Sequence, residues 1–488
     1  MKRSILLFLQ SVLWQVKIAR PIAKLSCMVV FLLYHDHAKS QSFEAAIAAN
    51  DRLISSFVEN CKVPGLSMAV IHKGKLVWHK EYGLSHIELG RPVTDSSKFR
   101  IASVSKLFTG TAILMLHKSG KLHLDDPVSK YLDFLPLHYE HITIRQIAQH
   151  TSGIGHYLDE KDALDLVDYA TPQEALGKFV NRPLLHPPDG GVTYSSFAYT
   201  VLAAVIEKAT GKDFLTAMHD LIFEPFGMYD TEADQQRKII TSRTGFYQYG
   251  NKLKWENAQP INLSGRWAGS GFLSTAIDVA RFGAFHTALA GFFTKEDLDL
   301  LTAPRQINDT LRSVEGLGWG QRTDWEGRMM YWGDGRTPGS TCGLLVFPEH
   351  ELSIAILTNI RRAPLDRGEF QALCVRLIAA VEKSKIKEIG QEDVGAYQLE
   401  ININGNSLNG TLDLHSLNGI AGTFDFHNLQ KFKVIDMFWK DGSLWVFAVG
   451  TGEAPIAVGI LPIKLKPEGN FLVGEIFRLG ATVKVTKN

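Results

Sequence analysis

Apolar residues recur along the chain either at the spacing of an amphipathic helix or at every second position, as in a strand. The order of these two patterns predicts how the chain is organised. Residues 43–60 carry the spacing of an amphipathic helix. Residues 65–83, GLSMAVIHKGKLVWHKEYG, alternate as two strands joined by a turn at Gly74. The N-terminal part of the globular region is therefore expected to be a helix followed by a β-hairpin.

Helical spacing then dominates from residue 103 to about residue 230. Short strands follow between residues 265 and 380, and one further helix is expected at about 367–384. The order of these elements predicts mixed helical and strand structure over residues 41–385, with most helices in one continuous block.

The pattern changes again towards the C-terminus. Residues 386–394 belong to a charged stretch with few apolar positions, which predicts a linker. Residues 395–488 then read as strand after strand, separated by Gly, Asn and Asp turns. This spacing predicts a separate all-β domain, either a sandwich or a barrel.

Residues 1–40 differ from the rest because basic residues precede two short apolar runs. Neither run reaches the roughly 18–20 residues that a membrane-spanning helix needs. The second run has the length of a signal-peptide core, and small residues follow it at Ala38 and Ser40. We expect an export signal and a periplasmic or extracellular protein, with an uncleaved membrane anchor as the alternative.

Composition excludes several classes of function. The 52 basic and 51 acidic residues leave a net charge of +1, so no bulk charge favours nucleic acid. The four cysteines, Cys27, Cys61, Cys342 and Cys374, fit neither a zinc site nor a disulfide framework and are expected to be unpaired. There is no Gly-rich phosphate loop, and we expect neither a metal nor a cofactor. The sequence does not indicate an oligomeric state.

The segment FRIASVSKLFTGTAI places Ser103 and Lys106 three residues apart on an apolar helix. This spacing puts both side chains on one helical face. Apolar surroundings disfavour the charged amine, and a neutral amine can take the serine proton. The pattern alone is weak, since Ser384 and Lys387 repeat it in the solvated, charged stretch at the predicted linker, where it has no functional meaning.

The order of further blocks is much more specific. After FRIASVSKLFTGTAI come GKLHLDDPVSKYL, ITIRQIAQHTSGI, VTYSSFAYTVLAAVIEKATG, FEPFGMYDT, AGSGFLSTAIDVARF, GLGWG and GDGRTPGSTCGLLVFPE. Over residues 43–380 the chain resembles the serine β-lactamase-like superfamily, in the branch of class C β-lactamases, D-peptidases and esterases. The resemblance implies an α+β fold, in which helices and a helical subdomain flank an antiparallel sheet, ahead of the C-terminal all-β domain.

The resemblance also implies roles for individual residues. The first motif makes Ser103 the nucleophile and Lys106 its partner. The second motif, Tyr-x-Asn, matches Tyr194-Ser195-Ser196, so Tyr194 would relay protons. Ser196 stands where the family has asparagine, and its shorter hydroxyl puts any contact with a substrate amide in doubt.

The third motif, a basic residue two positions before glycine, matches Gly333-Asp334-Gly335. Gly335 fits, whereas Gly333 lacks the basic side chain and is expected to leave a wider pocket. The backbone N–H groups of Ser103 and Arg336 would bind the oxyanion, and the Arg336 side chain is a candidate for the lost cation. Two similar patterns, His72-Lys73-Gly74 and Tyr249-Gly250-Asn251, lie in the wrong blocks.

Four other polar or aromatic residues are expected to be structural. His150 should shape the rim of the site, Asp125 and Asp126 should fix a turn before Pro127, and Tyr199 should lie in the core.

These features favour an exported serine hydrolase that acts through an acyl-enzyme on a small molecule or a peptide. The class could be an esterase, a D-peptidase or a weak β-lactamase, and the missing basic residue favours an ester or amide without a neighbouring carboxylate. The alternative is a catalytically weak binding or scaffold protein, because two of the three motifs are altered.

Overall fold

The computed structural model describes residues 45–487, except residues 252–253, 288–289, 362, 364–366, 383, 385, 390–392, 417–419, 427–429, 452–459, 470 and 478–480. The predicted export signal over residues 1–40, with Cys27, lies outside the described residues. Within them, no helix is both long and apolar enough to cross a membrane.

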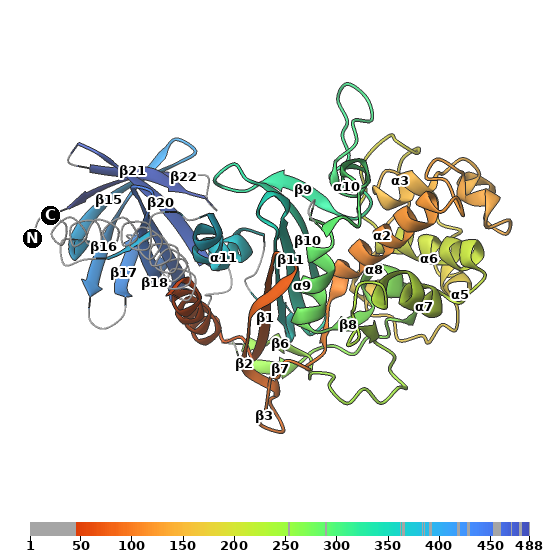
Figure 1. Ribbon diagram of the computed structural model, residues 1–488, viewed down its shortest axis with the longest axis horizontal. Helices are drawn as coiled ribbons and strands as arrows, with labels where there is room; N and C mark the ends of the chain where they lie inside the picture. The colour runs from red at the N-terminus through yellow and green to blue at the C-terminus, as the bar shows by residue number, and fades with distance from the viewer. Residues whose placement is uncertain are drawn as a thin grey trace, which may run out of the picture.

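A seven-stranded sheet of order β3-β2-β1-β12-β11-β10-β9 forms the middle of the molecule (Figure 1). All the pairings recorded between its neighbouring strands are antiparallel. Its strands are β1 (Gly65–His72), β2 (Lys75–His86), β3 (Arg91–Pro92), β9 (Gly320–Thr323), β10 (Met329–Thr337), β11 (Ser340–Phe347) and β12 (Leu352–Thr358). The hairpin predicted at residues 65–83 is β1 and β2.

Both faces of this sheet are buried, as the alternation of side chains along β1 illustrates. Ala69 and Ile71 belong to one hydrophobic cluster, whereas Met68 and Val70 belong to another. Successive side chains of a strand point to opposite faces, so two separate layers must cover the sheet.

The first layer is the helical region that carries the site (Figure 1). Its centre is α2 (Ser105–Lys118), which is buried on nearly every side and follows the 3-10 turn η1 (Ala102–Val104). Around it lie α3 (Ile144–Ala148), α4 (Glu160–Ala163), α5 (Pro172–Leu176), α6 (Ser196–Thr210), α7 (Phe214–Met218), α8 (Trp267–Ser270), α9 (Ala276–Ala284) and α10 (Lys295–Thr302). The small sheet β4-β8-β5 completes this region: β4 (Phe99–Arg100), β5 (Glu232–Ala233) and β8 (Phe272–Ser274). A second small sheet, β13-β6-β7, contributes Tyr247 and Ile360 to the cluster on the other face of the central sheet: β6 (Tyr247–Tyr249), β7 (Trp255–Asn257) and β13 (Ile360–Arg361).

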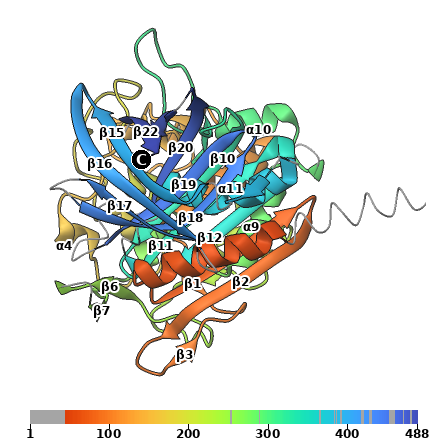
Figure 2. The ribbon, with the colours of Figure 1, turned by 90° about the vertical axis from the view of Figure 1, so that its left-hand side faces the viewer.

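The second layer consists of a helix over residues 45–60, α11 (Arg367–Glu382) and one side of the C-terminal domain. Figure 2 looks onto that domain, with the red helix of residues 45–60 beside it. Leu53 and Phe57 of this helix share one cluster with Leu373 of α11 and with Phe438 and Trp445 of the C-terminal domain.

The C-terminal domain is a closed antiparallel barrel, which decides between the two predicted architectures. Each strand from β15 to β22 pairs with the next, and β22 pairs back with β15. Its strands are β15 (Gly395–Ile403), β16 (Asn406–Ser416), β17 (Ile420–Phe426), β18 (Gln430–Lys440), β19 (Ser443–Thr451), β20 (Ile460–Glu468), β21 (Phe471–Ile476) and β22 (Ala481–Lys487). A third hydrophobic cluster is built from alternate residues of its strands.

The predicted linker at residues 386–394 begins with a short strand. Residues Ile386–Glu388 form β14, which pairs with Lys440 to Phe438 at the end of β18. A strand of three residues is too short to show an alternation of apolar and polar positions. The sequence therefore indicated only that this segment is charged.

A buried ion pair ties the barrel to α11. Arg376 of α11 and Asp436 of β18 form two hydrogen bonds, Nε to Oδ2 at 2.7 Å and Nη2 to Oδ1 at 2.8 Å. The two residues are 1 % and 5 % exposed. The Arg376 guanidinium also lies 4.0 Å from the centre of the Phe438 ring. The barrel is thus joined to α11 and to the central sheet by both apolar and charged contacts.

Candidate active site

The predicted nucleophile lies at the junction between η1 and α2, against strand β10. Ala102 precedes Ser103 with φ +45°, a left-handed conformation that is uncommon for alanine. This places the Ala102 methyl group towards β10, where Gly335 has no side chain. A Cβ at position 335 would lie 2.5 Å from the Ser103 nitrogen and 2.8 Å from the Ala102 Cβ.

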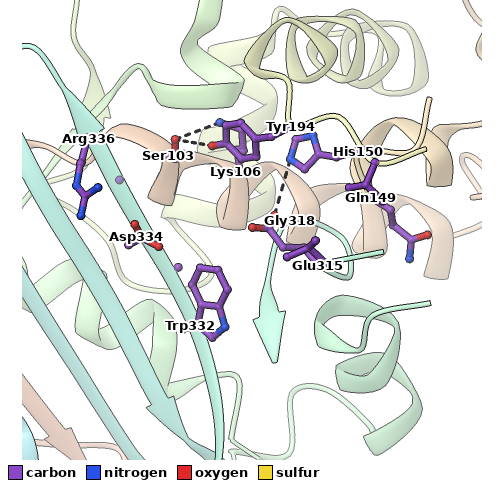
Figure 3. A pocket seen from close by; sticks show the side chains of 14 residues that line it. Ser103, Lys106, Gln149, His150, Tyr194, Glu315, Gly318, Trp332, Asp334 and Arg336 are labelled. Atoms are coloured by element: carbon purple, nitrogen blue, oxygen red, sulfur yellow. Dashed lines mark hydrogen bonds and ion pairs between the residues drawn. The ribbon is translucent and has the colours of Figure 1, made fainter. Parts of the chain in front are cut away.

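Gly335 therefore has a steric explanation, and it brings the backbone of β10 next to the Ser103 N–H group. The neighbouring Arg336 N–H belongs to the same strand, as the two-donor oxyanion site implied by the sequence requires. Figure 3 shows the exposed Arg336 side chain on this side of the pocket, with Asp334 beside it.

Lys106 is held by three contacts on the first turn of α2. Its Nζ lies 2.7 Å from the Gly269 carbonyl oxygen, 3.1 Å from the Ser196 Oγ and 3.3 Å from the Ser103 Oγ. The residue is 1 % exposed, and this burial, with the nearby Arg266 charge, lowers the pKa of Lys106 to about 7, although the Glu315 carboxylate acts to raise it. A large fraction of the amine is then neutral at physiological pH.

Tyr194 completes the group predicted from the sequence. Its hydroxyl donates a hydrogen bond to the Ser103 Oγ at 2.7 Å. The ring faces the open pocket and the residue is 42 % exposed, yet protein surrounds the hydroxyl, and this desolvation raises the pKa of Tyr194. The phenol therefore remains protonated, as a donor and not as the base.

Ser196 is found behind the nucleophile, where it contacts Lys106. The Ser196 hydroxyl therefore contacts the Lys106 amine, whereas the sequence had left open whether it contacts the substrate. Ser196 lies at the start of α6, where the Ser195 side chain accepts a hydrogen bond from the Ala198 N–H and caps the helix.

Gly333 lines the pocket and packs closely against α2. A Cβ at this position would lie 2.5 Å from the Leu107 Cδ1. A basic side chain here would therefore require Leu107 to move, whereas glycine fits without any change. The sequence could identify the missing cation, but the direction of the side chain depends on how β10 packs on α2.

His150 and His156 position the tyrosine segment. The His150 Nδ1 accepts a hydrogen bond from the Ser195 N–H, and the His156 Nδ1 accepts one from the Ser196 N–H, both at 3.1 Å. The centre of the His150 ring also lies 4.5 Å from that of the Tyr194 ring, with the two planes tilted by 41°. Burial holds the pKa of His150 well below its usual value and that of His156 at about 4. Both rings are therefore neutral, as these acceptor contacts require.

The remaining residues that were expected to be structural have structural contacts. Asp125 forms two hydrogen bonds with Arg145, and Asp126 accepts bonds from Lys130 and Tyr131. Tyr199 is buried and donates to the Ala148 carbonyl oxygen. Cys61, Cys342 and Cys374 are buried.

The pocket has a volume of about 370 Å³ and opens beside the nucleophile (Figure 3). It is lined by Ser103, Lys106, Gln149, His150, Val192, Tyr194, Val314, Glu315, Gly318, Trp332, Gly333, Asp334, Gly335 and Arg336. Sequence reasoning missed Glu315. Its only signal was the following GLGWG stretch, whose glycines indicate a close approach of the backbone to a neighbour.

The first testable consequence concerns Gly335. Replacing it with alanine should reduce turnover about a hundredfold, because the added methyl group pushes β10 away from the Ser103 N–H and separates the oxyanion donors. The measurement is kcat for ester hydrolysis. The control is Gly343→Ala on β11, where the nearest atom of Phe370 lies at 3.1 Å. Full activity of Gly335→Ala would contradict this assignment of the oxyanion site.

Known proteins resemble this chain in sequence and in fold. The family model described as Beta-lactamase matches residues 50–373. The chain is 30 % identical over 314 residues to the serine beta-lactamase-like protein LACTB, mitochondrial, from Homo sapiens, covering 50 % of this chain and 57 % of that protein. It is 33 % identical over 221 residues to the esterase EstB of Burkholderia gladioli, covering 41 % and 56 %.

The chain thus spans little more than half the length of these relatives. Among solved structures, the octameric penicillin-binding protein homologue from Pyrococcus abyssi superposes with a TM-score of 0.59 and 18 % identity. That match covers 90 % of this chain and all of the other chain, and at this identity it supports the shared fold alone.

Proposed function

The chain belongs to the beta-lactamase family of serine hydrolases, and from this premise we propose that it hydrolyses small esters or amides through an acyl-enzyme on Ser103. One observation supports this most directly. The Ser103 Oγ lies between the Tyr194 hydroxyl at 2.7 Å and the amine of a lysine whose pKa is lowered to about 7.

The three contacts of Lys106 satisfy a protonated amine, which would donate to all three oxygens, and they also accommodate the neutral base. A neutral amine has two N–H groups and one lone pair. The Gly269 carbonyl oxygen and the Ser196 Oγ lie at donor distances of 2.7 and 3.1 Å. With both N–H groups directed to these acceptors, the lone pair faces the Ser103 hydroxyl at 3.3 Å.

In the proposed reaction, the Ser103 oxygen attacks the substrate carbonyl while its proton passes to the Lys106 Nζ. The developing oxyanion binds the N–H groups of Ser103 and Arg336. The tetrahedral intermediate then loses the alcohol or amine, which takes a proton from Tyr194, and Lys106 returns its proton to the tyrosine. Water then hydrolyses the ester on Ser103: as its oxygen attacks, the Tyr194 hydroxyl relays its proton to Lys106, and Lys106 returns a proton to the departing Ser103 oxygen.

Within this class we propose an esterase or amidase rather than a β-lactamase. The third motif has no basic side chain at position 333, and Leu107 fills the space beside it. Two carboxylates, Glu315 and Asp334, line the pocket instead. Their negative charges disfavour a substrate with its own carboxylate, unless the Arg336 guanidinium binds that group.

The experiment is covalent labelling with a fluorophosphonate probe, followed by mass spectrometry of the labelled peptide. We expect one adduct on Ser103 in the wild type and none in Ser103→Ala. The control is Ser105→Ala, which alters a fully buried serine of the same peptide and should still be labelled.

Labelling of Ser103→Ala, or undiminished ester hydrolysis by it, would overturn the assignment of the nucleophile. A wild-type protein that neither reacts with the probe nor hydrolyses any ester of a test panel would favour the binding or scaffold alternative.

A further inference from the structure

One wall of the pocket is a short loop that holds Glu315 in place. The loop packs so closely on its neighbours that two of its residues have no room for a side chain. A Cβ at Gly316 would lie 2.3 Å from the Leu301 carbonyl oxygen, and one at Gly318, where φ is +81°, would lie 2.5 Å from the Tyr199 hydroxyl. Glu315 precedes these glycines, so its backbone position is fixed from one side by α10 and from the other by α6.

The Glu315 carboxylate faces a neutral partner across this wall. Its Oε2 lies 3.8 Å from the His150 Nε2, and its side chain is 13 % exposed (Figure 3). Because the His150 Nδ1 accepts the Ser195 N–H, the proton of the neutral ring is assigned to Nε2. This buried nitrogen has no hydrogen-bond partner among the described residues. The histidine therefore brings no positive charge to the carboxylate.

A carboxylate has about four acceptor positions, so the contacts that Glu315 already makes, with His150 among them, leave room for a donor on a substrate. Val192 and Val314 line the same pocket and offer apolar surface for the body of a substrate. A cavity of about 370 Å³ suits a small acyl group. The wall thus combines apolar contact with one fixed negative charge, close to the tyrosine that contacts the nucleophile.

We propose that Glu315 selects acyl groups that carry a protonated primary amine beside the scissile carbonyl, so that the preferred substrates are aminoacyl esters or amides. This inference rests on the proposed function, because it concerns the acyl group that Ser103 would receive. The ammonium donates to the Glu315 carboxylate, and the small side chain of the acyl group packs against the valines.

Glu315 has a second effect that must be separated from recognition. Its negative charge acts to raise the pKa of Lys106, so its removal shifts the pH dependence of turnover to lower pH. That effect belongs to the free enzyme and is the same for every substrate. Recognition, in contrast, changes the ratio of kcat/KM between substrates that differ only in charge.

The test uses ethyl esters of alanine, isobutyric acid and methylmalonic acid, which place an ammonium, a methyl group or a carboxylate at the same position. Both enantiomers of alanine are included, and hydrolysis is followed by acid release at pH 7, where an α-amino group is still largely protonated. The quantity compared is the alanine-to-isobutyrate ratio of kcat/KM, in wild type and in Glu315→Gln.

For one alanine enantiomer, this ratio should fall about tenfold or more in Glu315→Gln, as expected for the loss of a charge-assisted hydrogen bond. The methylmalonate-to-isobutyrate ratio should rise. The matched control is Asp334→Asn, which removes one negative charge from the opposite wall and should change the alanine ratio much less.

An unchanged alanine-to-isobutyrate ratio in Glu315→Gln would overturn the inference. An equal fall of that ratio in Asp334→Asn would also overturn it, because the preference would then depend on the total negative charge of the pocket and not on Glu315. Failure of the proposed function is recognised separately, since Ser103 would then not be labelled and none of the three esters would be hydrolysed.

Discussion

Replacing Lys106 with arginine is expected to reduce kcat for ester hydrolysis by about 10²–10⁴-fold, the usual contribution of a general base. A guanidinium stays protonated at any working pH and cannot accept the Ser103 proton. The site is also only 1 % exposed, so the larger head group must displace the Ser196 and Gly269 contacts. The control is Lys121→Arg at an exposed position, which should leave kcat unchanged.

The wild-type pH profile gives an independent reading of the same residue. The neutral amine is the active form, and the pKa of Lys106 is lowered to about 7. The value of kcat/KM should therefore rise with pH through about 7 and level off above it. A profile that rises only near pH 10, or a Lys106→Arg variant with more than a tenth of wild-type turnover, would make the lysine structural.

The largest expected effect on stability lies far from the pocket, at the Arg376–Asp436 pair. Replacing Arg376 with methionine should lower the free energy of unfolding by about 3–5 kcal/mol, because Asp436 is left buried without its partner. Urea unfolding followed by tryptophan fluorescence measures the loss, since Trp445 belongs to the cluster that joins the barrel to the sheet.

A double variant separates a lost partner from lost packing. Arg376→Met combined with Asp436→Leu replaces the pair with apolar side chains of similar size, which is often neutral or stabilising at buried pairs. Most of the stability should return. If the double variant is as unstable as Arg376→Met alone, the cost lies in packing around Phe438 and not in the unpaired charge.

The sequence predicted the parts of this protein that depend on local pattern. Ser103, Lys106 and Tyr194 are brought together at 2.7 to 3.3 Å, as their motifs implied. Alternation and turn residues identified the C-terminal strands, but closure into a barrel depends on the pairing of β15 with β22, which joins the two ends of that region. Local periodicity contains no information on such a distant pairing.

What the sequence missed depends on tertiary contacts. The direction of position 333 follows from the packing of β10 on Leu107, and one extra residue in the strand would have reversed it. Glu315 looked like an ordinary surface residue, because only the fold brings its loop to His150. The acceptor roles of His150 and His156 likewise depend on backbone groups some 40 residues away.

The cluster shared by the helix of residues 45–60, α11 and the barrel has a consequence for how such proteins can be recombined. A chimaera joined at residue 395 would bring a new barrel onto an apolar surface formed for this one, and Arg376 would be buried without Asp436. A workable exchange must transfer α11 and β14 with the barrel. The segment that has to be exchanged as one piece therefore begins near residue 367. This lies within residues 41–385, the region that the sequence pattern places before the barrel.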